Sequence, residues 1–178
     1  MIRLFSAIRV PNIVAAGLVE RQHGVPDARW RPPESLHITL RFFGEMPEPT
    51  ADDLDQALAA VGGRRFTLRL EGTGHFGEGD RIRAIWAGVA ESAPLRALAA
   101  RCESAARRVG LKPETRNYAP HVTLAYLTRP DPARVAAWLQ SHNLLKSDPF
   151  EVERFGLYSS WPGKSGSVYR LEREYLLS

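Results

Sequence analysis

The chain has 178 residues, of which 44% are hydrophobic and 25% are charged, and its formal net charge at pH 7 is +4. This composition excludes a disordered chain, and the length fits one large domain or two small lobes. Cys102 is the only cysteine, which excludes a disulfide framework and a thiolate metal site. No apolar run approaches the roughly 20 residues that span a bilayer, and the N-terminus lacks the apolar core of a signal peptide. We therefore expect a soluble protein of the cytoplasm, without membrane contact. We also expect a monomer.

The first half of the chain predicts five elements. In order, they are a strand at residues 2–9, a helix at about 11–23, a strand at 36–43, a helix from residue 50 to the glycines at 62–63, and a strand at 65–70. Pro11 suits the first turn of its helix. Thr50 and Asp53 resemble a capping box with Asp in place of Glu. The segment from Gly72 to Gly79 is typical of a glycine-rich turn, and we expect a boundary between two parts of the chain there.

The second half predicts the same order of elements and one further strand. They are a strand at about 82–89, a helix at 93–109, a strand at 121–127, a helix at 132–142, and strands at 150–158 and 168–176. Asp131 and Pro132 form a strong helix start, as N-cap and first-turn proline. Cys102 lies in an apolar stripe at helical spacing, which is typical of a core residue. A polar loop, residues 159–167, joins the last two strands.

The repeated order of elements predicts an α+β fold in a single domain, residues 1–178. We expect two similar lobes, about residues 1–72 and 80–178, each an antiparallel-rich sheet with helices outside. An internal pseudo-duplication would relate the lobes around a central cleft. The strands at 36–43 and 121–127 lie at the centre of the two halves, so we expect them to face each other across this cleft.

Both central strands carry the same tetrad, which consists of a histidine, a β-branched residue, a threonine and a leucine. The copies are His37–Leu40 and His121–Leu124. Residues two apart in a strand point to the same face. His37 and Thr39 therefore share one face, while Ile38 and Leu40 point into the core. In the second tetrad, His121 and Thr123 likewise share one face. Two such faces brought together place two imidazoles and two hydroxyls around one small anion.

This set of groups suits acid–base catalysis on a small anion such as a phosphate ester. A base takes a proton from the attacking group, and an acid protonates the departing oxygen on the opposite side of the phosphorus. Histidine has an unperturbed pKa of about 6.5, so His37 and His121 can share these roles near pH 7. Thr39 and Thr123 can donate hydrogen bonds to the non-bridging oxygens, whose charge changes in the transition state. The arrangement needs no metal and no cofactor.

The tetrads and the segments around them resemble the 2H phosphoesterase superfamily, and specifically its RNA 2′,3′-cyclic phosphodiesterase branch, also called 2′-5′ RNA ligase. Beyond the tetrads, the resemblance is carried by Arg29–Leu36, Arg41–Glu45, Arg83–Val89 and Leu157–Ser160. The resemblance implies a hydrolase that opens RNA 2′,3′-cyclic phosphate ends to 2′-phosphomonoesters, with weak 2′-5′ ligation in reverse. It also implies that His37 is the proton donor and that His121 is the base that activates water.

One position departs from this branch. Its members often carry an arginine two residues after the second tetrad, where this chain has Tyr126. We expect either that Arg129 takes over a phosphate contact or that Tyr126 stacks on a base. Arg41 and Arg116 flank the tetrads and are further candidates for phosphate binding, against a role on the solvated surface. The positive net charge fits an RNA partner.

Two other functions stay open. A nucleotide- or RNA-binding module could retain this fold without turnover, and binding of a cyclic nucleotide without ring opening would favour it. A metal-dependent phosphohydrolase could use the two tetrad histidines as ligands, but no nearby Asp or Glu spacing completes a metal site. The remaining histidines are expected to be structural, because His23 and His142 lie near helix C-termini and His75 lies in the glycine-rich turn.

Overall fold

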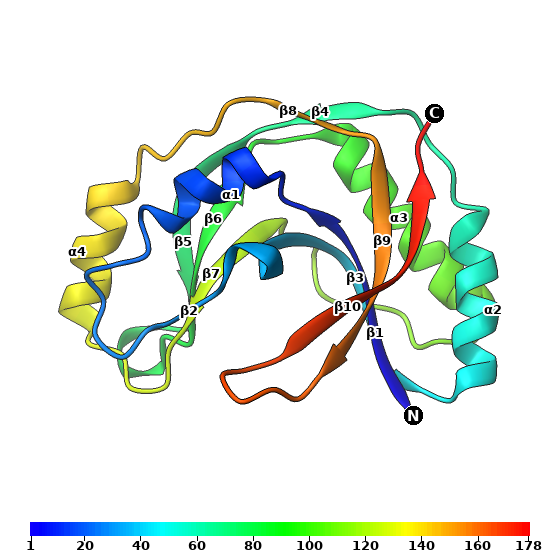
Figure 1. Cartoon of the computed structure of the whole chain (residues 1–178), viewed down its shortest axis with the longest axis horizontal. Coiled ribbons are helices and arrows are strands. Elements are labelled where there is room, and N and C mark those ends of the chain that lie inside the picture. The colour runs from blue at the N-terminus through cyan, green and yellow to red at the C-terminus, as the bar shows by residue number, and fades with distance from the viewer.

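A computed structural model describes all 178 residues, with ten strands and four α-helices (Figure 1). The strands are β1 (Ile2–Arg9), β2 (Arg29–Trp30), β3 (His37–Met46), β4 (Phe66–Leu68), β5 (Leu70–Phe76), β6 (Ala84–Val89), β7 (His121–Tyr126), β8 (Phe150–Val152), β9 (Arg154–Trp161) and β10 (Val168–Leu176). The helices are α1 (Asn12–Val19), α2 (Glu48–Ala59), α3 (Ala93–Arg108) and α4 (Pro132–His142), with 3-10 turns η1 (Pro33–Ser35) and η2 (Gly79–Arg81).

Eight of the strands form one antiparallel sheet in the order β10-β9-β1-β3-β7-β6-β5, with β2 paired to β7. A single register pair, Ile38 with Val122, joins β3 to β7, so the sheet consists of two halves that meet at this point. Strands β4 and β8 form a separate pair. The predicted α+β class with an antiparallel sheet is thereby confirmed.

The two halves of the sheet are not the two halves of the chain. Strands β9 and β10 follow the second tetrad in sequence, yet β9 pairs with β1, where Leu4 is the register partner of Ser159. Strand β5 comes from the first part of the chain and pairs with β6 beside the second tetrad. The ranges 1–72 and 80–178 therefore do not coincide with the halves, because the C-terminal strands return to the N-terminal one.

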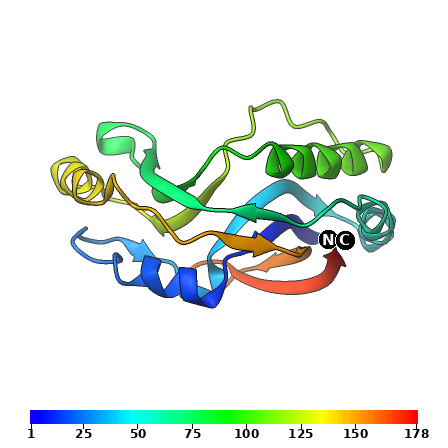
Figure 2. The same cartoon turned by 90° about the horizontal axis from the view of Figure 1, so that it is seen from above.

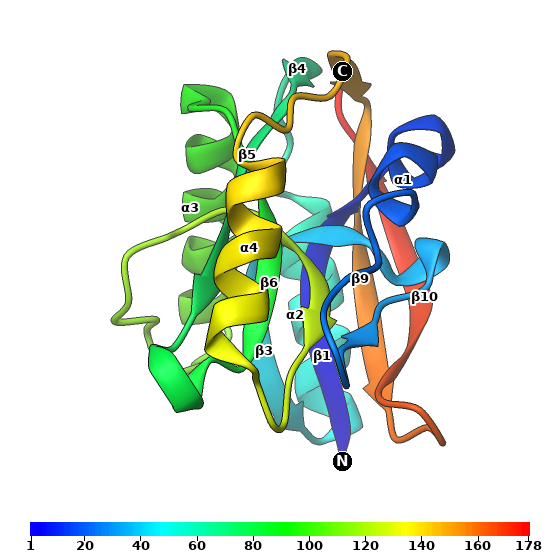
Figure 3. The ribbon, with the colours of Figure 1, turned by 90° about the vertical axis from the view of Figure 1, so that its left-hand side faces the viewer.

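The helices lie outside the sheet (Figure 2), and each contributes buried side chains to the core. Helix α3 contacts α2 and β3, and α4 packs against β5 (Figure 3). One cluster of 38 buried residues runs through both halves, so they share a core. Cys102 lies within it, as its stripe predicted, and burial raises the pKa of its thiol to about 12. None of the four helices is long and apolar enough to cross a membrane.

Two local predictions are wrong. Helix α2 begins at Glu48 rather than at Thr50, with Pro49 in its first turn. No side chain caps it, because its N-cap residue is Pro47, which has no side-chain acceptor. The predicted glycine-rich turn is largely strand β5. A Cβ atom added to Gly74 would lie 2.3 Å from the Trp86 ring, so this glycine serves close packing rather than a turn. By contrast, α4 has the predicted start, with the Asp131 carboxylate accepting from the backbone N–H of Arg134.

Candidate active site

The two tetrads lie side by side at the centre of the sheet. Ile38 and Val122 face each other across β3 and β7, and both are fully buried on the core side. The histidines and threonines of the tetrads alternate with these residues and point to the opposite side, which we call the histidine face. In an antiparallel pair, the residue after Ile38 comes next to the residue before Val122. Thr39 is therefore directed toward His121. An approximate two-fold axis through the Ile38–Val122 pair relates the two tetrads.

Both imidazoles are held by the same kind of hydrogen bond. Nδ1 of His37 lies 2.7 Å from the carbonyl oxygen of Ser35, and Nδ1 of His121 lies 2.7 Å from that of Ala119. A carbonyl oxygen can only accept, so each Nδ1 carries a hydrogen. The other ring nitrogen, Nε2, is therefore a proton acceptor in the neutral ring. Each imidazole is thus oriented and set in one tautomer by the chain two residues before it.

Aromatic rings flank each imidazole. Phe5 and Tyr169 lie 5.0 and 5.2 Å from the ring centroid of His37. Phe76 and Trp86 lie 4.8 and 6.0 Å from that of His121. These rings shield part of each imidazole from water, and removal from water disfavours the charged form of a histidine.

The pKa values of both histidines are lowered as a result. Burial lowers the pKa of His37 to about 4, the bond to Ser35 opposes the shift, and the charge of Arg31 adds to it. Burial also lowers the pKa of His121, against the bond to Ala119. Without a bound anion, both imidazoles are therefore neutral at pH 7 and both Nε2 atoms can accept a proton.

The threonine of the first tetrad contacts its own histidine. Oγ1 of Thr39 lies 3.1 Å from Nε2 of His37. Since Nδ1 of the neutral ring carries the hydrogen, the Thr39 hydroxyl donates in this bond. The hydroxyl of Tyr118 in turn donates to the backbone carbonyl of Thr39, at 2.9 Å, and holds the strand there. Thr123 occupies the equivalent position on β7.

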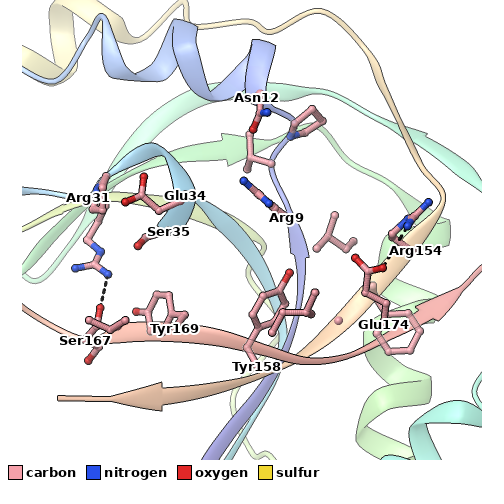
Figure 4. Close-up of a pocket in the computed structure, with 18 of the residues that line it drawn as sticks. Arg9, Asn12, Arg31, Glu34, Ser35, Arg154, Tyr158, Ser167, Tyr169 and Glu174 are labelled. Carbon is pink, nitrogen blue, oxygen red and sulfur yellow. Dashed lines mark hydrogen bonds and ion pairs between the residues drawn. The ribbon is translucent and has the colours of Figure 1, made fainter. Parts of the chain in front are cut away.

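Arg31 is a residue of the site that the sequence did not indicate. Its side chain is 6% exposed and forms no ion pair with a carboxylate, and Nη2 donates to the carbonyl of Ser167 at 2.9 Å (Figure 4). Its guanidinium carbon lies 5.8 Å from the centroid of the Tyr126 ring and 5.4 Å from that of Tyr169. Tyr126 therefore contacts a positive charge beside His37. In sequence, Arg31 follows Trp30 and precedes a proline, a pattern that carries no sign of burial.

Arg41 lies on the other side of the sheet, which corrects the expectation that it binds phosphate. Its guanidinium pairs with the carboxylate of Glu103 on α3 and donates to the carbonyls of Phe42 and Lys112. A β-bulge at Leu40, between the Ser6–Arg41 and Ala7–Thr39 register pairs, causes this reversal of the alternation. Arg41 therefore ties β3 to α3 and to the segment that follows it.

The second tetrad has a bulge at the same position. The register of β6 against β7 shifts at Leu124, between the pairs Ile85–Ala125 and Trp86–Thr123. Ala125 is consequently buried, whereas Tyr126 is 37% exposed on the histidine face. Tyr126 is thus brought to the site.

The remaining candidates lie farther from the site or make other contacts. Arg129 is exposed beyond the end of β7 and forms no ion pair, and Arg116 is exposed and pairs with Glu114 at 3.0 Å. His75 lies on β5, and Nδ1 of its ring contacts the carbonyl of Gly77. No group of three or more His, Cys, Asp and Glu side chains is arranged to hold a metal ion.

Known proteins share both the sequence and the fold. The sequence model of the 2′-5′ RNA ligase superfamily matches residues 8–161. An RNA 2′,3′-cyclic phosphodiesterase of Aeropyrum pernix is 36% identical over 140 residues, 77% of this chain and 79% of that protein. An RNA 2′,3′-cyclic phosphodiesterase of Thermus thermophilus is 33% identical, and the match covers 98% of this chain and 90% of that protein.

Solved structures agree with the sequence relatives. The crystal structure of the protein TT0787 of Thermus thermophilus has a TM-score of 0.81 at 28% identity, covering 98% of this chain and 97% of that one. The crystal structure of E. coli LigT complexed with 3′-AMP has a TM-score of 0.79 at 25% identity. The match covers 99% of this chain and 98% of that one. With the paired tetrads on one face of its sheet, the chain belongs to the 2′-5′ RNA ligase superfamily.

Proposed function

We propose that the protein is an RNA 2′,3′-cyclic phosphodiesterase in which His37 and His121 act as general acid and general base. The observation that carries this proposal is the matched pair of imidazoles on one face. Each is held through Nδ1 by a backbone carbonyl at 2.7 Å, which leaves both Nε2 atoms for proton transfer. The names of the Aeropyrum and Thermus relatives support the activity.

The reaction needs two proton transfers on opposite sides of the phosphorus. Nε2 of His121 takes a proton from water as the water oxygen bonds to phosphorus. The bond from phosphorus to the sugar O3′ breaks, and O3′ receives a proton from Nε2 of His37. The products are a free 3′-hydroxyl and a 2′-phosphomonoester, and proton exchange with solvent restores the two imidazoles.

The lowered pKa of His37 requires that this residue gain its proton with the substrate. Burial and the charge of Arg31 hold the pKa at about 4 in the free protein. A cyclic phosphate carries one negative charge, which offsets the charge of Arg31 and favours the imidazolium. Once Nε2 of His37 is protonated, the Thr39 hydroxyl no longer donates to it and is free to donate to a phosphate oxygen. Substrate binding would thereby prepare both the acid and the anion site.

We propose that the same site also supports weak 2′-5′ RNA ligation. If the 5′-hydroxyl of a second RNA takes the place of water, His121 removes its proton and O3′ again departs beside His37. The product is a 2′-5′ phosphodiester, and its cleavage follows the same path in reverse. Water competes with the second RNA at far higher concentration, so hydrolysis dominates.

The test is to incubate the protein with 2′,3′-cyclic AMP and with an RNA that ends in a cyclic phosphate. Chromatography should show 2′-phosphate products, and His37→Ala and His121→Ala should each lower the rate about 100- to 10,000-fold. Binding of the cyclic nucleotide without ring opening would refute the activity and favour a binding module instead.

A further inference from the structure

A pocket of about 920 Å³ is lined by residues of β1, β9 and β10 (Figure 4), and these strands lie on the side of β3 away from β7. Neither tetrad histidine lines it, so it is distinct from the place where the phosphate reacts. It nevertheless begins next to that place. Ser35, which holds Nδ1 of His37, lies in its wall, and so does Tyr169, whose ring is 5.2 Å from that of His37. Its volume falls within the range of about 300–1,000 Å³ that is usual for ligand pockets.

The proposed reaction places the body of the RNA on this side. In-line displacement requires the attacking water and the departing O3′ to lie on opposite sides of the phosphorus. O3′ belongs to the terminal ribose, and it departs beside His37. The terminal ribose, and the RNA chain attached through its 5′ carbon, therefore extend past His37 toward the pocket.

Positive charge is in excess at the end of the pocket next to His37. Arg9 is the register partner of His37, is exposed, and forms no ion pair with a carboxylate; its side chain points into the open space of the pocket (Figure 4). Arg31 also lacks a carboxylate partner, and one unpaired carboxylate, Glu34, shares this end. At the far end Arg154 pairs with Glu174 at 3.2 Å, and Glu151 and Glu153 also line the wall, so that end carries no excess positive charge.

Aromatic rings form part of the pocket wall. Tyr158 and Tyr169 are both half-buried there. The Tyr158 ring stacks on Phe5, with ring centroids 5.5 Å apart and planes at 16°, which fixes its orientation. Bases of single-stranded RNA stack on such rings regardless of their identity, while guanidinium groups bind the phosphates between them.

We propose that this pocket binds the nucleotide that precedes the cyclic end of the RNA, with Arg9 contacting the phosphodiester that links the two. This assignment rests on the proposed function, because the direction of the chain follows from the departure of O3′ beside His37. The preceding base then lies between the phosphodiester and the tyrosines of the wall. The protein thus distinguishes an RNA end from a free cyclic nucleotide.

The test compares three substrates that differ in one part each: 2′,3′-cyclic AMP, the same nucleotide with a 5′-phosphate, and the dinucleotide ApA with a 2′,3′-cyclic end. In the wild-type protein, kcat/KM should rise about tenfold or more when the 5′-phosphate is added, the usual contribution of a charge-assisted hydrogen bond. It should rise again for the dinucleotide.

Arg9→Gln should reduce the first of these gains to about twofold, since the amide keeps a hydrogen-bond donor but loses the charge. Arg3→Gln is the matched control, because Arg3 lies on the same strand, is exposed, and has its guanidinium over the Phe42 ring instead. Arg3→Gln should keep the full gain. Equal kcat/KM for all three substrates in the wild type, or an equal loss on all three in Arg9→Gln, would overturn the proposal.

A binding experiment separates this inference from the proposed function. The Kd of ApA carrying a 2′-phosphate should be lower than that of 2′-AMP in wild type, and Arg9→Gln should remove most of the difference. If the wild type opens no cyclic phosphate but this difference is present, the proposed activity fails while the pocket assignment survives. If ring opening is normal and the difference is absent, the pocket assignment alone is wrong.

Discussion

Ile38 and Val122 face each other across β3 and β7, and theirs is the one register pair that joins the two halves of the sheet. Both side chains are fully buried, while the neighbouring histidines point to the other face. The spacing of the two imidazoles therefore depends on the packing of this apolar pair.

Ile38→Ala should thus impair both stability and activity. Truncation of a buried isoleucine costs about 2–5 kcal/mol in unfolding free energy, which chemical denaturation can measure. Because the cavity lies between the tetrads, kcat should also fall. Leu58→Ala is the control, since Leu58 is equally buried on α2, away from the tetrads. An equal loss of kcat in both variants would show that the pair does not set the spacing.

Thr39→Val and Thr123→Val should each lower kcat, on the order of 10- to 1,000-fold, because valine keeps the shape and the strand preference but removes the donor to the phosphate oxygens. Steady-state kinetics on a cyclic nucleotide measures this effect. If both valine variants turn over normally, the threonines are strand residues without a catalytic role.

The His37 imidazole should titrate far below an ordinary histidine and should change when an anion binds. NMR titration of the free protein should show its pKa near 4, and bound 2′-AMP should raise it, because the phosphate offsets the charge of Arg31. Binding of 2′-AMP should accordingly take up protons. Unchanged titration in the complex would mean that the phosphate does not lie next to this ring.

The same shift predicts how stability depends on pH. The unfolded chain protonates His37 near pH 6.5, whereas the folded protein does so only near pH 4. Between these values the unfolded state binds more protons, so this residue's contribution to stability is lost as pH falls from about 6.5 to about 4. His37→Asn removes the titrating imidazole. The Tm of this variant should therefore fall less than that of wild type between about pH 6.5 and pH 4. Parallel Tm curves would contradict the lowered pKa.

The roles of the two histidines can be separated by the leaving group. A sugar hydroxyl needs protonation to depart, whereas a nitrophenolate does not. On a nitrophenyl ester of a nucleoside phosphate, His37→Ala should recover much of its lost rate, and His121→Ala should not. Product analysis with wild type checks that the nitrophenolate departs beside His37. Rescue of His121→Ala alone would reverse the roles.

Activity should survive exhaustive treatment with EDTA. Two imidazoles, two threonines and Arg31 can supply proton transfer and anion binding, and no cluster of His, Cys, Asp and Glu is arranged for a metal ion. The measurement is kcat before and after chelation on 2′,3′-cyclic AMP. Loss of turnover that a divalent ion restores would contradict this mechanism.

The sequence by itself determined the features that follow from local pattern. Periodicity predicted the strands that carry the tetrads and the buried stripe of α3 with Cys102. Capping rules predicted the Asp131 cap of α4. Such features depend on residues close in the chain, so one sequence is enough to predict them. The family resemblance rests on the same local motifs.

Tertiary structure alone decided which side chains join the tetrads. Bulges at Leu40 and Leu124 arise from the pairing of β3 with β1 and of β7 with β6, and they turn Arg41 to the core side while bringing Tyr126 to the histidine face. Arg31 and the strand β10 reach the site only because distant segments fold back upon it. Strand partners and bulges are set by long-range packing, which the alternation of residues along one strand does not encode.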